Sequence, residues 1–543
     1  MRVPRDYQNE CIAAVDREFG NVNSTLVVMA TGLGKTCVMA EVAKHRSKAG
    51  AVLMLAHRVE LLDQAAEHFS HELGYTPEII QSNREIDWHG IGSGNNVIIG
   101  SVQTLRNPKR LERLKKYGIG TILIDEAHHA VARSYRTIVD FFRGENAELK
   151  TLGVTATPKR TDKKAIGVVF NSVAFQMEAS DGIKKGWLVE PIEERIIIDN
   201  VDFGEVPITF NELGEPDFSP SALEALMIEE GPLHAVAAPT LAKSDGRSVL
   251  VFTAGVAHAH LLAAILNREK PGSAAAVDGK TTPPGHPERN RIMSDFRKGK
   301  IQYVCNFGLL TEGTDVPTCD MIVVARPTKS VLILTQMVGR GLRPLPGIVD
   351  GHTLPTVRRA AIAESAKPTA LILYFSPKSA NVKTATTYDA LGGNYDDDVI
   401  ALAKQMDADE PGKKVTERLE EAALLYPVIA QNKLRKKIKA EVEWRTESVG
   451  NNQESANHNV SNIQRGGASD KQIESLIALG VTYQAAAKYT AAQAWTVTDK
   501  LRQERCTTKQ RNLLQRFGQD PNVNYHKARE LIDAIAKNGW KPL

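Results

Sequence analysis

One short stretch, residues 30–36, constrains the fold of this chain more than any other. It follows an apolar run, residues 26–29, and precedes a helical pattern over residues 37–44, so it lies at a strand-to-helix turn. The stretch reads Ala30-Thr31-Gly32-Leu33-Gly34-Lys35-Thr36. Successive backbone N–H groups in such a turn, with the positive end of a helix behind them, form a cradle for phosphate groups. The sequence therefore predicts a polyphosphate site here.

The side chains of this turn indicate a nucleoside triphosphate with Mg²⁺. Lys35 would reach the β- and γ-phosphates, and the Thr36 hydroxyl would be a metal ligand. The strict phosphate-loop pattern has glycine at position 29, where this chain has Met29, so a flexible turn without a ligand is the alternative. The residues expected to hold the nucleotide are Thr31, Gly32, Gly34, Lys35 and Thr36.

A second Gly-Lys-Thr sequence, Gly279-Lys280-Thr281, also follows an apolar stretch. Pro283 and Pro284 come immediately after it, and proline does not fit the interior of the helix whose N-terminus must face the phosphate. We therefore reject this segment as a nucleotide site.

Composition sets the broad class. The 543 residues are enough for roughly three or four domains, and 42% hydrophobic with 24% charged residues is typical of a globular protein. We expect a cytoplasmic protein with no membrane contact, because we find neither an apolar run of about 18 residues nor a secretory signal. The five scattered cysteines argue against a disulfide framework or a zinc site. A net charge of +4 is compatible with nucleic acid as a partner but does not require it.

Two adjacent acids follow a predicted strand in the first part of the chain. The apolar run 121–124 leads directly into Asp125-Glu126-Ala127-His128. Open parallel sheets place their ligand chemistry at the carboxyl ends of strands. Asp125 can hold Mg²⁺ through its water shell, and Glu126 can orient or deprotonate an attacking water.

Three segments resemble motifs I, II and III of superfamily 2 helicases of the DEAH type, in order and at plausible spacing: Ala30–Thr36, Asp125–His128 and Thr155–Thr157. The resemblance implies ATP as the nucleotide. It makes Gln8, with Arg5 beside it, the adenine-reading group, although a lone glutamine is usually only a surface residue. It also gives His128 a catalytic role, with an ordinary histidine at a helix start as the alternative.

The same resemblance assigns contacts with a nucleic-acid strand. His57-Arg58 and Ser101–Thr104 fall where the family has motifs Ia and Ib, and Leu310–Pro317 resembles motif V. The motif V segment adds Gly313 and Asp315 to the nucleotide-binding residues. The residues expected to contact nucleic acid are His57, Arg58, Gln103, Thr104 and Thr311.

Three further functional residues lie in Gln336–Arg343, which resembles motif VI with its second glycine shifted. Gln336, Arg340 and Arg343 are expected to be catalytic. On a helix, the three-residue spacing of the arginines would put both guanidinium groups on one face. Such arginine fingers change phosphoryl-transfer rates by roughly 10³–10⁵. An ordinary cationic helix face is the alternative.

The alternation of apolar runs and helical patterns predicts an α/β fold with two tandem doubly wound parallel-sheet domains and an α-helical C-terminal region. The helicase resemblance implies that the two domains are RecA-like. The expected divisions are 1–195 for the first domain with the ATP-binding loop, 196–234 for a connector, 235–380 for the second domain with the arginine fingers, 381–450 for charged helices, 451–467 for a linker and 468–543 for a helical repeat.

The repeat consists of residues 469–480 and 507–518, which align at an offset of 38. Each copy begins with a hydroxyl residue suited to an N-cap and ends with a glycine suited to a helix C-terminus. The region resembles tail modules of phage-type helicases, and binding of DNA, binding of a protein partner, and structural support all remain open. The cationic cluster Lys433–Lys439 is either a polyanion contact or a solvated helix face.

The resemblance therefore implies an ATP-dependent translocase or helicase, related to RadD-like repair helicases and restriction-enzyme motor subunits. DNA is favoured as the nucleic acid, in repair, recombination or replication, because that branch works mostly on DNA; this is analogy. Two alternatives remain: a motor subunit of a restriction-type nuclease complex, and a nucleotide-gated DNA clamp or scaffold that does not translocate.

Overall fold

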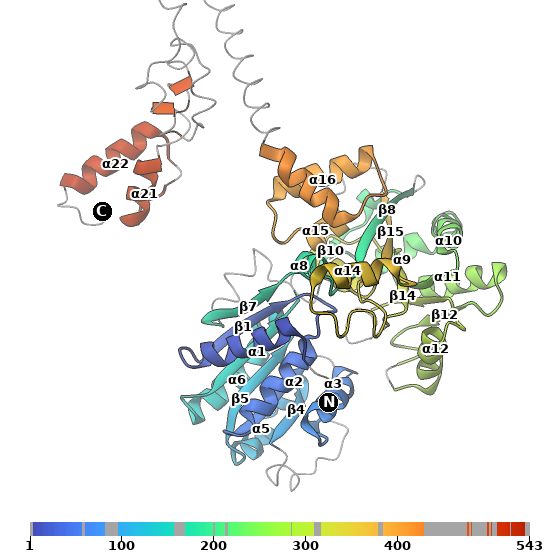
Figure 1. The fold of residues 1–543 in the computed structure, drawn as a ribbon, viewed down its shortest axis with the longest axis horizontal. Helices are drawn as coiled ribbons and strands as arrows, with labels where there is room; N and C mark the ends of the chain where they lie inside the picture. The colour runs from blue at the N-terminus through green and yellow to red at the C-terminus, as the bar shows by residue number, and fades with distance from the viewer. Residues whose placement is uncertain are drawn as a thin grey trace, which may run out of the picture. The chain divides into compact units, whose positions relative to one another are not determined.

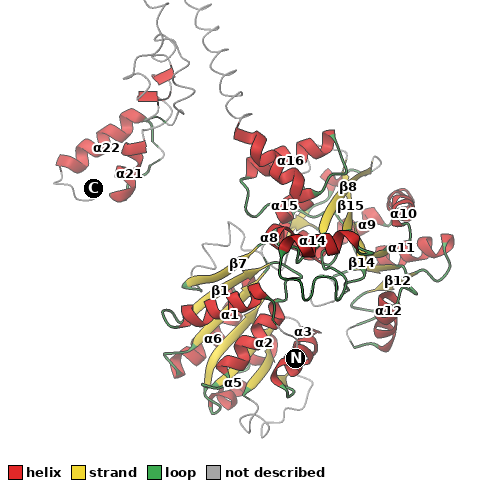
Figure 2. Ribbon diagram, viewed as in Figure 1, coloured by secondary structure: helices red, strands yellow, loops and turns green. Residues whose placement is uncertain are grey.

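The computed structural model describes two compact units, Met1–Leu424 and Leu425–Leu543 (Figure 1). The described residues are 4–56, 60–81, 96–156, 169–198, 201–211, 215–283, 285–308, 316–377 and 384–427, with 475–476, 479, 497–498, 501, 508–521 and 523–537. Figure 2 shows that the first unit combines β-sheets with surrounding helices, and that the second unit is helical where it is described.

The first sheet has seven strands, all parallel. In spatial order they are β3 (Glu78–Ile80), β4 (Val97–Ser101), β2 (Ala51–Ala56), β5 (Ile119–Asp125), β6 (Lys150–Thr155), β1 (Ser24–Met29) and β7 (Ser172–Met177). Its helices are α1 (Asp6–Phe19), α2 (Lys35–Arg46), α3 (Glu60–Leu73), α4 (Val102–Leu105), α5 (Pro108–Lys115), the 3₁₀ turn η1 (Ala127–Val131) and α6 (Arg133–Glu145). We call this sheet with its helices the first lobe.

Helices cover both faces of the first sheet, which explains why its strands are continuous apolar runs in the sequence. Leu26 and Val28 of β1 belong to a core shared with α5 and α6. Val27 and Met29 alternate with them and are also buried, while α1 and α2 contact strands of the same sheet. The carboxyl ends of β1 and β5 are therefore held at one edge by a core on each side.

The second sheet has six strands, again all parallel. In spatial order they are β12 (Ala274–Val277), β13 (Tyr303–Asn306), β11 (Ser248–Phe252), β14 (Cys319–Val324), β15 (Thr369–Pro377) and β8 (Glu190–Ile198). Its helices are α9 (Pro220–Met227), α10 (Glu230–Ser244), α11 (Val256–Glu269), α12 (Pro287–Arg297), α13 (Val331–Gly339) and α14 (Pro355–Glu364). This sheet with its helices is the second lobe. The two parallel sheets confirm the predicted α/β fold class.

The chain passes from the first lobe to the second between β7 and β8, through α8 (Ala179–Lys184) and residues 185–189. The range 196–234, which the sequence suggested as a connector, contains the 3₁₀ turn η2 (Phe203–Glu205), the hairpin β9 (Ile208–Phe210) and β10 (Pro216–Phe218), and the start of α10. Phe203, Phe218 and Leu223 of this range belong to the core of the second sheet. The exact domain boundaries stay predictions.

Two hydrogen bonds join the helices that follow the second sheet to its edge strand β8. These helices are α15 (Thr387–Leu391), α16 (Asp397–Asp409) and the helical residues 415–427. The backbone N–H of Thr387 donates to Glu193 Oε2 (2.7 Å), and the Thr416 backbone N–H donates to Glu190 Oε1 (3.0 Å). Burial raises the pKa of Glu193 to about 6, even though the contacts with Thr387 favour its charged form.

In the second unit, α21 (Thr508–Arg516) and α22 (Tyr525–Lys537) pack around Leu514, Ala528 and Ile535. Gly518, with φ +70°, follows α21, and the Gln519 N–H donates to the Leu514 carbonyl (2.9 Å), as in a glycine-terminated helix. Most of the first repeat copy, the linker 451–467 and the cluster Lys433–Lys439 lie outside the described residues. Among the helices that the structure describes, none has both the length and the apolar character needed to cross a membrane.

Candidate active site

The predicted phosphate loop joins β1 to α2 and is built on two glycines with positive φ. Gly32 has φ +92° and Gly34 has φ +85°, conformations that other residues rarely adopt. A Cβ on Gly34 would lie 2.4 Å from Gln8 Nε2, so the packing also excludes a side chain there. Lys35 and Thr36 begin α2, whose positive end therefore lies at the loop. The backbone itself lines this cradle.

The N-terminal end of α1 supports the phosphate loop through the Leu33 carbonyl. Tyr7 Oη and Gln8 Nε2 both donate to that oxygen, at 2.8 and 3.0 Å. The Arg5 backbone N–H donates to Gln8 Oε1 (2.9 Å). An amide group has two N–H donors and an oxygen with two lone pairs, so these bonds use half of the capacity of Gln8. The structure places Gln8 against the loop and Arg5 next to Gln8, and their contact with adenine stays a prediction.

The acids lie at the end of β5, across from the phosphate loop. Asp125 Oδ1 accepts a hydrogen bond from the Glu126 N–H (2.9 Å), and Glu126 has φ +48°, a left-handed conformation for a residue with a side chain. Lys35 Nζ lies 3.3 Å from Glu126 Oε1, and the two side chains are only 12% and 13% exposed. The phosphate-binding lysine and the second acid are thus already paired.

The electrostatics of Glu126 favour its ionised form. Burial raises the pKa of a carboxyl group, but the charges of Lys35 and His128 outweigh this effect and hold the pKa of Glu126 below its ordinary value. His128 Nδ1 lies 3.4 Å from Glu126 Oε2 and 3.4 Å from Thr155 Oγ1, so it connects the acids with the end of β6. Thr157 lies outside the described residues.

The second lobe contacts the phosphate loop through the segment that contains both predicted arginine fingers. A Cβ on Gly339 would lie 2.6 Å from Thr31 Cβ, so only glycine allows this approach. A Cβ on Gly32 would lie 3.2 Å from Arg343 Cγ. Gln336, in α13, is buried at 5% exposure. The structure therefore brings Arg343 to the loop, from the other sheet.

The expectation that both arginines share one helix face is wrong. α13 ends at Gly339, Arg340 is its C-cap, and Arg343 lies beyond the helix. The physical reason is Pro344, because a residue before proline is disfavoured in the helical region.

Backbone contacts that the sequence did not reveal hold the Arg343 segment in place. Lys367, 2% exposed, donates from Nζ to the carbonyls of Arg343 (2.7 Å) and Pro317 (2.9 Å). The Val189 N–H donates to the Leu342 carbonyl (2.7 Å). An isolated lysine and a valine at a strand start carry no pattern from which these roles could be found.

Two family models match the chain in this same order. Residues 2–160 match the type III restriction enzyme res subunit, and residues 233–344 match the helicase conserved C-terminal domain. IRC3 of Saccharomyces cerevisiae, named as a candidate ATP-dependent helicase, is 30% identical over 428 residues, which are 75% of this chain and 58% of IRC3. This chain belongs to the superfamily 2 helicases.

A second curated relative and a solved structure agree with the assignment. The irc3 protein of Schizosaccharomyces pombe is 32% identical over 357 residues, covering 62% of this chain and 55% of that protein. The chain thus spans somewhat over half the length of these curated relatives. The solved structure of the type ISP restriction-modification enzyme LlaBIII bound to DNA has a TM-score of 0.52 at 14% identity, covering 99% of this chain and 40% of that one, which supports the fold.

The residues predicted to contact nucleic acid are only partly described in the structure. Gln103 is exposed, whereas Thr104 is 6% exposed and its hydroxyl accepts a hydrogen bond from Ser101 Oγ (2.7 Å). The remaining predicted residues of motifs Ia and V lie outside the described part of the chain: His57, Arg58, Thr311, Gly313 and Asp315. Their roles stay predictions.

The rejected Gly279-Lys280-Thr281 segment has no free cradle for a phosphate. Asp278 Oδ1 accepts hydrogen bonds from the backbone N–H groups of Lys280 (2.6 Å) and Thr281 (2.8 Å). The next helix, α12, begins only at Pro287. A carboxylate therefore already occupies the N–H groups that a phosphate would need.

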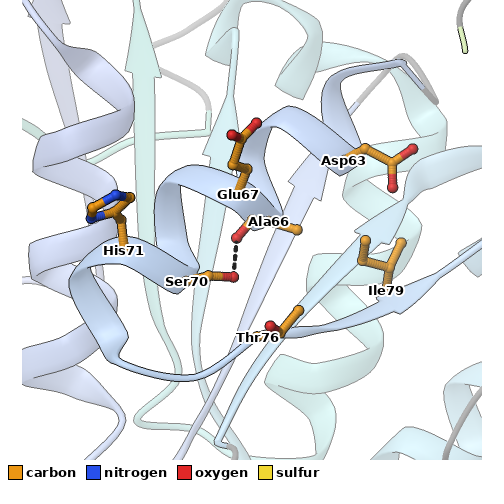
Figure 3. Close-up of a pocket in the computed structure, with 7 residues that line it drawn as sticks. All are labelled: Asp63, Ala66, Glu67, Ser70, His71, Thr76 and Ile79. Atoms are coloured by element: carbon orange, nitrogen blue, oxygen red, sulfur yellow. Dashed lines mark hydrogen bonds between the residues drawn. The ribbon is translucent and has the colours of Figure 1, made fainter.

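A surface hollow of about 630 Å³ lies elsewhere in the first lobe, between α3 and β3 (Figure 3). Asp63, Glu67 and Ser70 of α3 line it, and Ser70 Oγ donates to the Ala66 carbonyl within the helix (2.5 Å). β3 is the edge strand opposite to the one that flanks β1. The hollow is therefore separate from the phosphate loop.

Proposed function

We propose that this chain is an ATP-dependent DNA translocase or helicase acting in repair, recombination or replication. The observation that carries the proposal is the contact of the second lobe with the phosphate loop, Gly339 on Thr31 and Arg343 on Gly32. A phosphate site touched by the other lobe allows nucleotide binding to alter how the lobes fit together. Membership of the helicase family supports the same activity.

In the proposed reaction, Lys35 leaves its ion pair with Glu126 and binds the β- and γ-phosphates of ATP. Glu126, ionised because its pKa is held low, then orients the attacking water. His128 lies against Glu126 Oε2 and restrains that carboxylate. The ion pair seen in the structure is thus the resting arrangement of the two groups.

The residues at the loop also fit Mg²⁺. The Thr36 hydroxyl and the Asp125 carboxylate are hard oxygen donors, and Mg²⁺ in nucleotide sites usually takes one or two carboxylates with phosphate oxygens and water. The left-handed glycines present backbone N–H groups without side chains, which suits the phosphates. When bound, Mg²⁺ neutralises charge on the phosphate oxygens.

The second lobe would supply the cationic groups of the reaction. Arg343 lies on the loop, and Arg340 and Gln336 belong to the same segment. Guanidinium groups stabilise the charge that develops in phosphoryl transfer, so the segment senses whether ATP or its products are bound. Repeated closing and opening of the lobes on a strand gripped by its phosphates gives sequence-independent, salt-sensitive movement.

We propose DNA as the nucleic acid because the chain resembles a branch of the family that works mostly on DNA. The relatives' names support a helicase activity and do not specify DNA or RNA. The cytoplasmic location and a protein partner for the C-terminal repeat also stay predictions.

The decisive measurement is ATP turnover with single-stranded DNA, duplex DNA, forked DNA and RNA, followed by triplex displacement on the preferred duplex. We expect DNA to stimulate turnover and the third strand to be released only with hydrolysable ATP. Absence of ATP turnover with every nucleic acid would overturn the proposed function.

A second candidate is the motor subunit of a restriction-type nuclease complex, which the description of the N-terminal family model favours. It predicts DNA cleavage once partner subunits and Mg²⁺ are added, whereas a translocase acting alone leaves the DNA intact. A nucleotide-gated clamp, the third alternative, would bind DNA in response to ATP without displacing a triplex strand.

A further inference from the structure

The passage between the two lobes contains a tryptophan, Trp187, packed against two arginines. Its side chain is buried, at 4% exposure. The guanidinium carbon of Arg358 lies 3.8 Å from the ring centroid, and that of Arg5 lies 4.7 Å from it. The indole N–H donates to no described residue, so the ring is held by packing and by these cations.

The two arginines belong to different lobes. Arg5 precedes α1 in the first lobe, two residues from Tyr7, which supports the phosphate loop. Arg358 belongs to α14 in the second lobe, beyond the arginine fingers. Arg5 also forms an ion pair with Asp350 of the second lobe (3.1 Å). The tryptophan therefore lies where both lobes and the passage meet.

Hydrogen bonds fix Arg358 to the passage as well as to its own lobe. Its Nε donates to the Lys185 carbonyl (2.8 Å), and Nη1 donates to the carbonyls of His352 (2.9 Å) and Thr353 (3.1 Å). A Cβ on Gly186, which has φ +71°, would lie 2.7 Å from Arg358 Cβ. The planar guanidinium thus makes several bonds and also contacts the ring, which a lysine could not do.

The residues that follow Trp187 contact the phosphate loop and the segment that contains Arg343. Leu188 Cδ2 would lie 3.0 Å from a Cβ on Gly32, so the side chain rests on the phosphate loop. Val189 donates to the Leu342 carbonyl, next to Arg343. Three successive residues therefore contact the cation pair, the loop and the finger segment. Closely packed contacts of this kind shift as units, because packed interiors have discrete arrangements.

We propose that Trp187 is a positioning residue that couples occupancy of the phosphate loop to the fit between the lobes, with Arg358 as its partner in the second lobe. This inference rests on the proposed ATP-driven function. A change at the loop reaches Leu188, and the neighbouring ring carries it to α14 through Arg358. Neither residue touches the phosphates in this scheme.

The test is a coupling measurement on the full chain. The affinity for a fluorescent single-stranded DNA oligonucleotide is measured with and without a non-hydrolysable ATP analogue, and the ratio of the two affinities is the coupling. Allosteric couplings typically amount to ~5–150-fold and are reciprocal, so oligonucleotide should change analogue affinity by the same factor. Trp187→Leu should bring both ratios to about one, while the affinity for analogue alone stays near that of the wild type. Trp187→Phe, which keeps an aromatic face, should retain most of the coupling.

Phe19→Leu is the matched control. Phe19 is also 4% exposed, and the guanidinium carbon of Arg46 lies 5.6 Å from its ring centroid, but both residues belong to the first lobe. Loss of packing alone would affect the two leucine variants alike. We expect Phe19→Leu to keep the wild-type coupling ratio even where its melting temperature falls.

Arg358→Lys provides a second route if Trp187→Leu does not fold. It keeps the charge but loses the fork that joins Lys185 to His352, so the coupling ratio should fall while Trp187→Phe keeps it. Wild-type coupling in Trp187→Leu would overturn this inference and leave the proposed function standing. The same holds for wild-type coupling in Arg358→Lys, where that variant replaces Trp187→Leu. Equal loss of coupling in Phe19→Leu would overturn it too. A wild-type chain that neither turns over ATP nor responds to the analogue would overturn the proposed function.

Discussion

Lys35 Nζ lies 3.3 Å from Glu126 Oε1, so the lysine expected to bind phosphates is held by the carboxylate expected to direct water. Each side chain is mostly buried, and each lowers the cost of burying the other's charge. ATP phosphates that attract Lys35 would release the carboxylate at the moment it is needed. The pair therefore links substrate binding to activation of the site.

Glu126→Gln should abolish ATP turnover while leaving ATP binding intact. The amide has the shape of the carboxylate but cannot act as a base, and loss of such a group costs about 10²–10⁴ in rate. Lys35→Ala should also abolish turnover, through loss of ATP binding. Steady-state ATPase and binding of a fluorescent ATP analogue distinguish the two.

Glu41→Gln is the control for these variants. The Glu41 carboxylate lies 3.3 Å from Lys44 Nζ within α2, and its side chain is 12% exposed, so it matches the burial and the pairing distance of the Glu126 carboxylate, although Lys44 is more exposed than Lys35. It should turn over ATP normally. Normal turnover in Glu126→Gln or Lys35→Ala would contradict the assigned roles.

Gly339→Ala tests whether the contact between the lobes is used. A Cβ there would lie 2.6 Å from Thr31 Cβ, and overpacking of this kind costs about 1–3 kcal/mol, or roughly 5–150-fold in the population of the closed arrangement. We expect DNA-stimulated ATPase to fall by that factor. Gly392→Ala meets Ile400 Cδ1 at the same 2.6 Å away from the loop, so it should lower the melting temperature and spare turnover. Equal ATPase in the two variants would count against a role for the contact between Gly339 and Thr31 in turnover.

Arg343→Ala should bind ATP but lose nucleic-acid-stimulated turnover, by about 10³–10⁵ if it acts as an arginine finger. The reason is its place on Gly32 of the loop, reached from the other lobe. Arg291→Ala is a suitable control, because Arg291 is 62% exposed and pairs within α12 with Glu288 (2.6 Å). Stimulation by DNA that persists in Arg343→Ala would refute the assignment.

Much of the site could be predicted because its residues follow local rules. β1 and β5 contain apolar runs, as expected for strands buried on both faces; β5 ends at Asp125, and the loop after β1 leads to Lys35 at the start of α2. Gly32 and Gly34 were readable because only glycine suits their backbone conformation. The placement of these groups at one edge follows from parallel topology.

The rest depended on contacts between residues far apart in the chain. Trp187 meets Arg5 and Arg358, and Lys367 reaches the Arg343 carbonyl, but no spacing rule connects such pairs. The three-residue spacing of Arg340 and Arg343 suggests a helix, but α13 ends at Gly339 and Pro344 disfavours a helical conformation at Arg343. Tertiary packing, rather than local pattern, therefore decides how the two lobes meet.

The buried Glu193 at the junction of β8 and α15 should make the stability of the fold depend on pH. Burial raises the pKa of its carboxyl from an ordinary value of 4.5 to about 6. The folded state therefore binds the proton more tightly than the unfolded state, so this contribution to stability is full below about pH 4.5 and is lost as pH rises through about 6. The shift corresponds to about 2 kcal/mol.

Glu193→Gln cannot ionise but keeps a carbonyl acceptor for the Thr387 N–H, so its melting temperature should exceed that of the wild type increasingly between pH 5 and 7. Glu194→Gln, at the next position, removes a carboxylate that pairs with Lys243 (2.7 Å) at 31% exposure and should show no such growing gain. Melting curves of Glu193→Gln and the wild type that keep a constant separation across this range would contradict the assignment, since a neutral amide and a buried carboxylate can differ in pH dependence only through the proton that Glu193 binds.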